Sequence, residues 1–264
     1  MRNNIVLNEP LSRHTSWKVG GPADIFFTPN DRNDLSDFLK SNDCIITWLG
    51  NGTNILVRDA GVRGAVISTR KSLNKIELID QSNYLVEVGV SCFELAMYAT
   101  KNNFGPAAFF SGIPGSIGGA VIMNTGCYNN DISNILISIK VFDKKKMIEK
   151  EIKKEDIKFF YRGTNLSDDL IILSAKLKGS IGDKSQIEKL QNDLIERKKI
   201  SQPSQIKTCG STFKNIDNEK KAWMLIKEAG CNNYKVGDAE ISKKHCNFFV
   251  NNGKAKSEDI ENLM

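Results

Sequence analysis

Two glycine-rich segments have the residue types of loops that bind anions. The first is Leu49 to Asn54, with the sequence LGNGTN, and the second is Pro114 to Ala120, with the sequence PGSIGGA. Glycines let a ligand approach the backbone closely, and successive exposed N–H groups form a concave site for anions. Either cluster alone is more often a tight turn, but the two together favour a pyrophosphate held between them.

Neither loop matches a common nucleotide motif. The sequence contains no GxxxxGK[ST], which disfavours a P-loop kinase or ATPase. It also lacks a GxGxxG in a strand–turn–helix setting with a later acidic residue, which disfavours a Rossmann dinucleotide site.

The polar residues that could do chemistry lie further along the chain. Arg162 follows Tyr161, and Ser211 lies in GSTFKN with Lys214 and Asn215. Taken singly, Arg162 has the character of a surface arginine and Ser211 that of a turn or cap residue. A hydrolase triad is disfavoured because Ser211 lies in no GxSxG elbow and the chain has only two histidines.

The elements around the loops predict a mixed α/β protein. The apolar run Cys44–Leu49 predicts a buried strand before the first loop, and strands are expected at Ile55–Val57 and Ala65–Ser68. A helix is expected to start at Asp31 or Asn33. Ser91 and Glu94 form a capping box at the start of another helix, which Gly105 is expected to end.

The second half of the chain predicts a hairpin, a connector helix and a smaller unit. The hairpin pairs Ile135–Phe142 with Met147–Ile152, and Leu170–Leu177 is a further strand. Asp183–Lys199 predicts an amphipathic helix whose inner face includes Leu190. A helix at Glu219–Ala229 and a strand at Asn247–Val250 belong to the last unit.

Composition limits the classes of protein that remain. The 264 residues carry a net charge of +6 that is dispersed along the chain, which disfavours a nucleic-acid binder. The six cysteines show no CxxC spacing, so we expect free thiols and no metal site. No signal peptide or membrane span is visible, and we expect a cytoplasmic protein.

The order of the motifs resembles a known family. His14–Asp24 (HTSWKVGGPAD), the two glycine loops, YRGT at 161–164, GSTFKN at 210–215 and ISKKHCNF at 241–248 together resemble the UDP-N-acetylenolpyruvoylglucosamine reductases. The glycine loops also resemble those of the vanillyl-alcohol-oxidase-type flavoproteins. The resemblance implies an FAD-binding fold in two subdomains, residues 1–70 and 71–182, followed by a connector helix at 183–199 and a smaller α/β substrate domain at 200–264.

The resemblance also implies a reaction and its residues. NADPH would reduce FAD, and the flavin would pass hydride to the enolpyruvyl ether of UDP-N-acetylglucosamine, giving UDP-N-acetylmuramate for peptidoglycan. Arg162 would stabilise the developing carboxylate charge, and Ser211 would supply the proton. The FAD-binding residues would be Gly50, Asn51, Gly52, Thr53, Asn54, Gly115, Ser116, Gly118 and Gly119, and the substrate-binding residues Tyr161, Lys214, Asn215 and His245.

Some points stay open at this stage. Arg197 and Lys198 could contact the substrate diphosphate or could simply be a basic helix end. A flavin oxidase that uses oxygen is a rival within the same fold. We expect a monomer, and the stretch before Gly210 has no insertion like the lid of some relatives.

The last residues raise a second hypothesis. Ser257 is predicted to cap a helix that stops after about two turns, too short to be stable alone. The family has a further catalytic glutamate near its C-terminus, and the match places it beyond Met264. The alternative is therefore an impaired remnant that binds FAD or a UDP-sugar.

Overall fold

The N-terminal part of the chain forms a four-stranded sheet in the order β1-β2-β4-β3 in the computed structural model, which describes residues 4–127, 130–217 and 219–264. Its elements are β1 (Ile5–Pro10), β2 (Pro22–Phe27), α1 (Arg32–Ser41), β3 (Ile46–Leu49) and β4 (Val62–Ser68). Both β2 and β3 run parallel to β4, whereas β1 is antiparallel to β2. Asp31 is the N-cap of α1, and its carboxylate accepts a hydrogen bond from the Asp34 N–H at 2.8 Å.

Both faces of this sheet are covered. Neighbouring residues of β2 and β4 alternate between two cores, because successive side chains of a strand point to opposite faces. Phe27 and Ile67 belong to the main core, whereas Phe26 and Val66 belong to a smaller core on the other face.

The predicted strand at Ile55–Val57 is wrong, because these residues form a loop between β3 and β4. Val57 is buried in the smaller core, which explains the apolar pattern. The Ile55 carbonyl accepts from the Cys209 thiol at 3.5 Å instead of from a neighbouring strand.

A five-stranded antiparallel sheet in the order β10-β9-β13-β6-β5 follows. Its strands are β5 (Ile76–Leu78), β6 (Asn83–Glu87), β9 (Leu136–Asp143), β10 (Ile148–Lys153) and β13 (Leu170–Lys178). The predicted hairpin is confirmed, since Asp143 of β9 pairs with Ile148 of β10. The same unit contains the helices α2 (Cys92–Lys101) and α3 (Ile117–Ile122) and the 3-10 helix η2 (Gly105–Gly112).

The start of α2 is confirmed and its end is corrected. Ser91 and Glu94 form the predicted capping box. The helix ends at Lys101, before Gly105, because Asn103 adopts the left-handed conformation with φ of 58°. Gly105 instead begins η2.

The connector helix α4 (Lys184–Ser201) packs on α2 and η2. Ile187 and Leu194 are buried as predicted, but Leu190 is 48% exposed. Gln191 takes the inner position, where its Oε1 accepts from the Thr100 hydroxyl at 2.8 Å. A buried hydrogen bond between two polar side chains therefore links α4 to α2.

The last part of the chain is a small sheet with two short helices. Its elements are α5 (Ala222–Glu228), β14 (Lys235–Val236), β15 (Ala239–Ile241), β16 (Phe249–Asn251) and α6 (Ser257–Leu263). The helix predicted from Glu219 is thus shorter than expected. Lys256, not Ser257, holds the N-cap position of α6, and the Ser257 hydroxyl accepts from the Asp59 N–H at 2.8 Å.

The remaining short elements connect these units. They are η1 (Leu11–Arg13), β7 (Gly126–Cys127), β8 (Asn130–Asp131), η3 (Ile132–Asn134), η4 (Lys154–Asp156), β11 (Phe159–Phe160) and β12 (Gly163–Thr164). Among the described residues, no helix is long and apolar enough to span a membrane.

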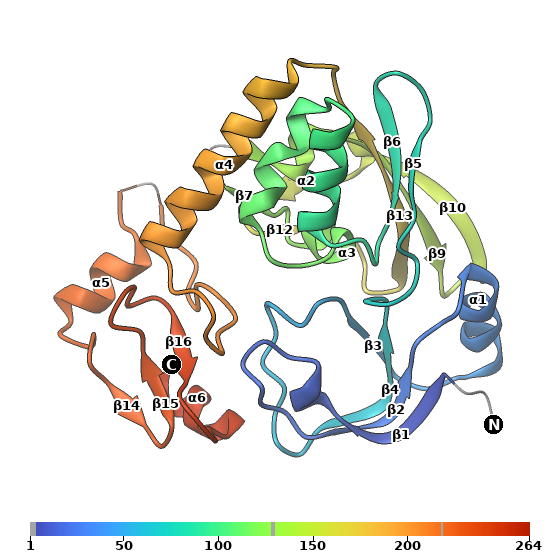
Figure 1. The fold of residues 1–264 in the computed structure, drawn as a ribbon. Coiled ribbons are helices and arrows are strands. Elements are labelled where there is room, and N and C mark those ends of the chain that lie inside the picture. The colour runs from blue at the N-terminus through green and yellow to red at the C-terminus, as the bar shows by residue number, and fades with distance from the viewer. Residues whose placement is uncertain (1–3, 128–129, 218) are drawn as a thin grey trace.

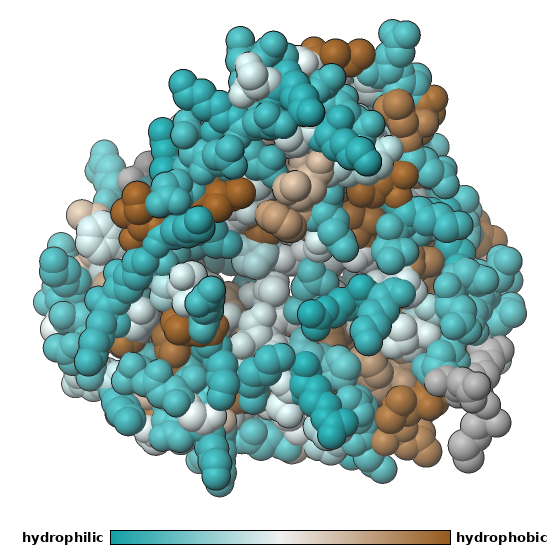
Figure 2. Space-filling view, in the orientation of Figure 1, coloured by the Kyte–Doolittle hydropathy of each residue, from teal (hydrophilic) through white to brown (hydrophobic). Residues whose placement is uncertain are grey.

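Figure 1 shows how the units are arranged. The five-stranded sheet and its helices lie above, the first sheet lies below them, and α4 descends from the upper unit to the C-terminal unit. The face in Figure 2 is mostly hydrophilic, with its apolar residues in separate small groups. The C-terminal unit shares a core with Trp17 and Val19 of the N-terminal part, so it is packed directly against the first sheet's loops.

Candidate functional site

The first glycine loop, Gly50–Asn54, is closed by the segment that begins at His14. The Ser16 N–H donates to the Gly52 carbonyl at 2.8 Å. Gly52 has φ of +66°, and a Cβ at this position would lie 2.0 Å from the His14 carbonyl oxygen. Only glycine therefore fits here, since any side chain would collide with backbone.

The second loop, Pro114–Ala120, lies directly against the first. The Thr53 hydroxyl donates to the Pro114 carbonyl at 3.4 Å. A Cβ on Gly50 would lie 2.5 Å from the Ser116 Oγ, so a glycine is needed for this close approach. The loop is anchored to α2, because the Cys92 N–H donates to the Gly115 carbonyl at 2.9 Å. The two loops singled out in the sequence thus form one structure.

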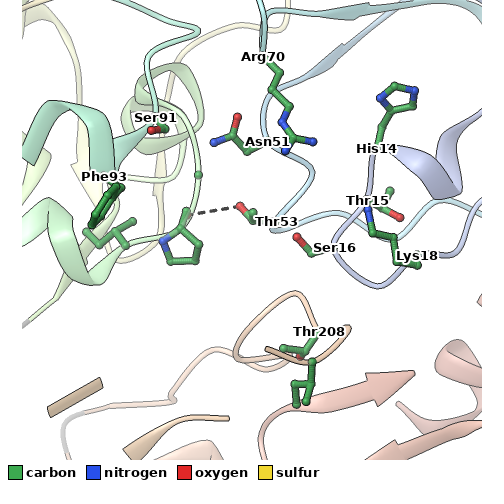
Figure 3. Close-up of a pocket in the computed structure, with 14 residues that line it drawn as sticks. His14, Thr15, Ser16, Lys18, Asn51, Thr53, Arg70, Ser91, Phe93 and Thr208 are labelled. Atoms are coloured by element: carbon green, nitrogen blue, oxygen red, sulfur yellow. Dashed lines mark hydrogen bonds between the residues drawn. The ribbon is translucent and has the colours of Figure 1, made fainter. Parts of the chain in front are cut away.

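A cavity of about 390 Å³ opens between these loops and the C-terminal unit (Figure 3). It is lined by His14, Thr15, Ser16, Lys18, Asn51, Thr53, Arg70, Ser91, Phe93, Ile113, Pro114, Gly115, Ile206 and Thr208. Of the predicted cofactor residues, Asn51, Thr53 and Gly115 are in this lining. Gly50, Gly52, Asn54, Ser116, Gly118 and Gly119 are not.

Two of the predicted cofactor residues, Ser116 and Gly118, make contacts within the protein. Ser116 is the N-cap of α3, and its Oγ accepts from the Gly119 N–H at 3.4 Å. The Gly118 N–H donates to the Val88 carbonyl at 3.1 Å, and a Cβ on Gly118 would lie 3.1 Å from the Val88 Cβ. These groups hold the second loop against β6 and its extension.

The lining contains residues to which the sequence analysis gave no cofactor role. Lys18 and Arg70 bring positive charge, and none of the fourteen lining residues is acidic. Figure 3 shows the Arg70 guanidinium extending toward Asn51. Lys18 and His14 lie in the HTSWKVGGPAD motif, which could have indicated them, whereas nothing in the sequence marks Arg70 after β4.

The residues present fit a polar, anionic cofactor. Thr208 contributes to the cavity from the C-terminal unit, and its buried hydroxyl has no hydrogen-bond partner among the described residues. Buried hydroxyls are usually hydrogen-bonded, so a ligand atom is the natural partner. Together with the glycine cradle and the two cations, this matches a dinucleotide with a pyrophosphate.

A second group of predicted residues gathers around Arg162. This residue adopts φ of +59°, its Nη2 donates to the Gly126 carbonyl at 2.9 Å, and its guanidinium lies 4.9 Å from the centre of the Tyr161 ring. Lys214 reaches it from the C-terminal unit, where its Nζ donates to the Arg162 carbonyl at 3.1 Å. Arg162, Tyr161 and Lys214 are therefore brought together by the fold.

Lys198 of α4 adds a third cation to this group. Burial lowers the pKa of Lys198. Burial also raises the pKa of the nearby Cys127 thiol to about 11, although Arg162 and Lys198 both act to lower it. Arg162, Lys198 and Lys214 form no ion pair with any carboxylate in the described part of the chain. The group can accept the negative charges of a ligand.

Ser211 is held beside the first loop by its neighbours. Cys209, two residues earlier, donates its thiol to the Gly52 carbonyl at 3.6 Å. Gly210 has φ of +84°, and the exposed Ser211 then forms an isolated bridge with Phe248. The serine is thus accessible and close in sequence to residues that line the cavity.

The last two predicted substrate residues have partners within the protein. The His245 ring packs on Phe248 with centroids 4.7 Å apart, and its Nδ1 accepts from the Asn247 N–H at 3.3 Å. Burial lowers the pKa of His245. The Asn215 Oδ1 accepts from the Ala222 N–H at the start of α5 at 3.1 Å, so only its amino group remains for a ligand.

Comparison with known proteins identifies similar sequences and structures. The family described as "FAD binding domain" matches residues 23–149, and the family described as "UDP-N-acetylenolpyruvoylglucosamine reductase, C-terminal domain" matches residues 202–264. The UDP-N-acetylenolpyruvoylglucosamine reductase of Rickettsia prowazekii is 42% identical over 95% of this chain and 85% of that protein. That of Clostridium tetani is 40% identical over 99% of this chain and 85% of that protein.

Solved structures agree with the sequences. The crystal structure of UDP-N-acetylenolpyruvylglucosamine reductase from Thermus caldophilus has a TM-score of 0.86 and 31% identity, and the match covers 98% of this chain and 91% of that one. An alkyldihydroxyacetonephosphate synthase matches 69% of this chain with a TM-score of 0.50 at 14% identity, which is a likeness of fold alone. The predicted FAD-binding fold with a smaller C-terminal domain is confirmed.

Proposed function

The chain belongs to the UDP-N-acetylenolpyruvoylglucosamine reductase family, and we propose that NADPH is its electron donor and that Arg162 and Ser211 are its catalytic residues. It is a flavoprotein oxidoreductase with FAD as cofactor, and it reduces UDP-N-acetylglucosamine enolpyruvate in peptidoglycan synthesis. The observation that carries the proposal is the hydrogen bond from the Lys214 Nζ of the C-terminal unit to the Arg162 carbonyl, at 3.1 Å.

The cavity residues would hold the cofactor. The glycine loops would hold its pyrophosphate through backbone N–H groups and the Thr53 hydroxyl, with Lys18 and Arg70 balancing the charge. Thr208 would supply a further hydrogen bond from the C-terminal unit. When bound, FAD would supply the redox chemistry that carries hydride from NADPH to the alkene of the substrate.

Arg162 is suited to hold the carboxylate of the enolpyruvyl group. Its guanidinium stays charged and presents a fork of N–H donors that matches a carboxylate. The bond to the Gly126 carbonyl and the stacking on Tyr161 fix its direction before the substrate arrives. A donor that is already oriented toward developing negative charge stabilises the transition state without reorganisation.

Ser211 is suited to deliver the proton to the alkene carbon next to the one that receives the hydride. Serine is a weak acid, so its oxyanion needs stabilisation, and the Lys214 ammonium three residues away can provide it. A positioned general acid contributes roughly 10²–10⁴-fold to the rate. Ser211 is exposed, so a substrate can reach it, and it lies two residues from Cys209, which contacts the first glycine loop.

The remaining cations and polar groups would bind the UDP-sugar. Lys198 and Lys214 are suited to the diphosphate, because neither forms an ion pair with a carboxylate among the described residues. Tyr161, the free amino group of Asn215, and His245 would complete this surface. His245 would act as a neutral donor through Nε2, since its Nδ1 is already an acceptor.

Separating the two half-reactions tests this proposal. NADPH should bleach the flavin absorbance of the anaerobic protein, and the UDP-enolpyruvyl sugar should restore it. Arg162→Gln and Ser211→Ala should each leave bleaching within about twofold and slow the restoration by about 10²–10⁴-fold. Arg63→Gln and Ser204→Ala, at exposed positions, serve as matched controls and should change neither step.

Each part of the proposal can fail separately. If NADPH does not bleach the flavin, NADPH is not the donor. If the substrate does not restore absorbance in the wild-type protein, the chain performs only the first half-reaction. If oxygen alone restores it at a catalytic rate, an oxidase is the better description.

Other properties remain predictions. We infer a cytoplasmic location from the nature of a UDP-sugar substrate, and a monomer from the sequence. Nucleic acid is not expected as a partner, since the cations described above converge on a small-molecule site.

A further inference from the structure

The short segment that carries Ser211 and Lys214 is held by one side chain. Asn247 lies just before β16 and is 3% exposed. Its Oδ1 accepts from the Phe213 N–H at 2.9 Å, and its Nδ2 donates to the Phe213 carbonyl at 2.9 Å. Its own backbone carbonyl accepts from the Thr212 N–H at 2.8 Å.

These three hydrogen bonds all fall on the two residues between Ser211 and Lys214. An asparagine amide presents one acceptor and a donor group in the geometry of a peptide group, so it can pair with a backbone amide as a neighbouring strand would. Aspartate offers only acceptors when ionised, and serine or threonine is too short to present both groups. The residue type therefore matches the contact closely.

The two ends of this segment point to different parts of the site. On one side, Ser211 pairs with Phe248, which follows Asn247 directly. On the other side, the Lys214 Nζ reaches the Arg162 carbonyl at 3.1 Å across to the second unit. A shift of Phe213 would move the serine and the lysine together, relative to Arg162.

We propose that Asn247 is a positioning residue of the reaction. It fixes the 211–214 segment so that Ser211, Lys214 and Arg162 contact the same bound substrate in the correct relative positions. The inference rests on the proposed roles of Ser211 and Arg162. Asn247 does not touch the substrate. It acts through the backbone of Phe213, and its effect falls on the substrate half-reaction and not on the half-reaction with NADPH.

The matched control is Asn251, a second buried asparagine, which is the last residue of β16. It is 4% exposed, and its side chain also makes three hydrogen bonds, to the Gly253 and Ala255 N–H groups and the Trp17 carbonyl. None of these contacts involves the 211–214 segment. Asn251→Ala therefore weakens the C-terminal unit without releasing Ser211.

The test compares Asn247→Ala with Asn251→Ala in the FAD-loaded protein. In single-turnover experiments, Asn247→Ala should be bleached by NADPH within about twofold of the wild-type rate. Its reoxidation by the UDP-enolpyruvyl sugar should be about 10- to 100-fold slower, as expected for a small misplacement of reacting groups. Asn251→Ala should keep both rates within about twofold.

Amide hydrogen exchange gives a readout that does not depend on activity. In Asn247→Ala, exchange at Thr212 and Phe213 should become faster while β14 and β15 keep the wild-type protection. Asn251→Ala should leave the 212–213 amides protected. An equal loss of protection across the whole C-terminal unit in Asn247→Ala would show a merely structural role and would overturn the proposal.

A conservative variant gives a second route to the same answer. Asn247→Asp keeps an acceptor for the Phe213 N–H but, when ionised, has no donor for the Phe213 carbonyl. Protonation restores a donor, so the ratio of variant to wild-type reoxidation rates should rise as pH falls from about 8 to about 6, because burial raises carboxyl pKa values. A ratio that is independent of pH would count against the proposed contact.

Two negative results have different meanings. Normal reoxidation of Asn247→Ala, or equal slowing in Asn251→Ala, would overturn this inference and leave the proposed function intact. Failure of the wild-type protein to be reoxidised would overturn the proposed function and this inference with it.

Discussion

At the scale of single residues, the site depends on polar groups that are held by the protein before any ligand binds. Arg162 is fixed by Gly126 and Tyr161, and Asn215 by the start of α5. The Thr208 hydroxyl is the contrasting case, because it is buried in the cavity wall and lacks a partner among the described residues. Under the proposed function, groups of the first kind would orient the substrate, and groups of the second kind would bond to a ligand.

His245 should make the stability of the protein depend on pH. Burial lowers its pKa below the ordinary value of 6.5. The unfolded chain then binds more protons than the folded one below about pH 6.5, so the free energy of unfolding should decrease as pH falls through that range. His245→Asn keeps an acceptor near the position of Nδ1 and cannot titrate.

Urea unfolding at about pH 7.5 and about pH 5.5 checks this expectation. The loss of stability between the two pH values should be larger for the wild-type protein than for His245→Asn. A loss of the same size in both proteins would show that the depressed pKa does not affect folding.

At the scale of elements, helix starts follow the local capping rules. The α1 helix begins after Asp31, whose carboxylate accepts from the Asp34 N–H, whereas Asn33 is exposed inside the first turn. Helix ends do not follow such a clear local rule. The α2 helix was expected to end at Gly105, but it ends before Asn103, which adopts the left-handed conformation. Asparagine occurs in many other settings, so its presence in a sequence does not by itself indicate a helix end.

Asp31→Ala should cost roughly 0.5–2 kcal/mol of stability, because an orphan N–H at the helix start loses its acceptor. Asn33→Ala is the matched control and should be neutral or slightly stabilising, since alanine has the higher helix propensity. Chemical denaturation of both variants measures the difference. Equal costs would mean that Asp31 does not cap α1.

At the scale of the whole molecule, the C-terminal unit is fastened to the N-terminal part by a tryptophan. The Trp17 Nε1 donates to the Phe249 carbonyl of β16 at 2.8 Å, and its ring belongs to the core of the C-terminal unit. Arg58 and Glu261 add an exposed ion pair at 2.8 Å, which is expected to contribute little. The C-terminal unit is therefore attached mainly by apolar packing and by the hydrogen bond from the Trp17 side chain to the β16 backbone.

Trp17→Phe should destabilise the protein by about 1–3 kcal/mol, because the buried Phe249 carbonyl loses its donor. Trp48→Phe is the control, since the Trp48 Nε1 has no partner among the described residues. Thermal unfolding should show a clearly lower Tm for Trp17→Phe than for Trp48→Phe. Comparable values would indicate that the hydrogen bond to β16 adds nothing to the attachment.

The sequence by itself determined the family, the mixed α/β class and most elements whose signal is local. The glycine loops, the capping box at Ser91 and the β9–β10 hairpin could be predicted from the sequence, because turn, cap and strand patterns depend on residues close together in the chain. The strand predicted at Ile55–Val57 and the buried position predicted for Leu190 were wrong. In both cases contacts with segments far along the chain decided the outcome.

Only the tertiary structure decided which residues share the site. Arg70 in the cavity and Thr208 reaching it from the C-terminal unit come from distant positions that no spacing rule connects. The resemblance implied one substrate site for Arg162 and Lys214, and the structure adds the hydrogen bond between them. The roles of Gly118 and Ser116 in packing, and of Asn247 in holding the 211–214 segment, are also visible only in space. The physical reason is that hydrogen bonds and close approach depend on distances between atoms, which a local pattern does not contain.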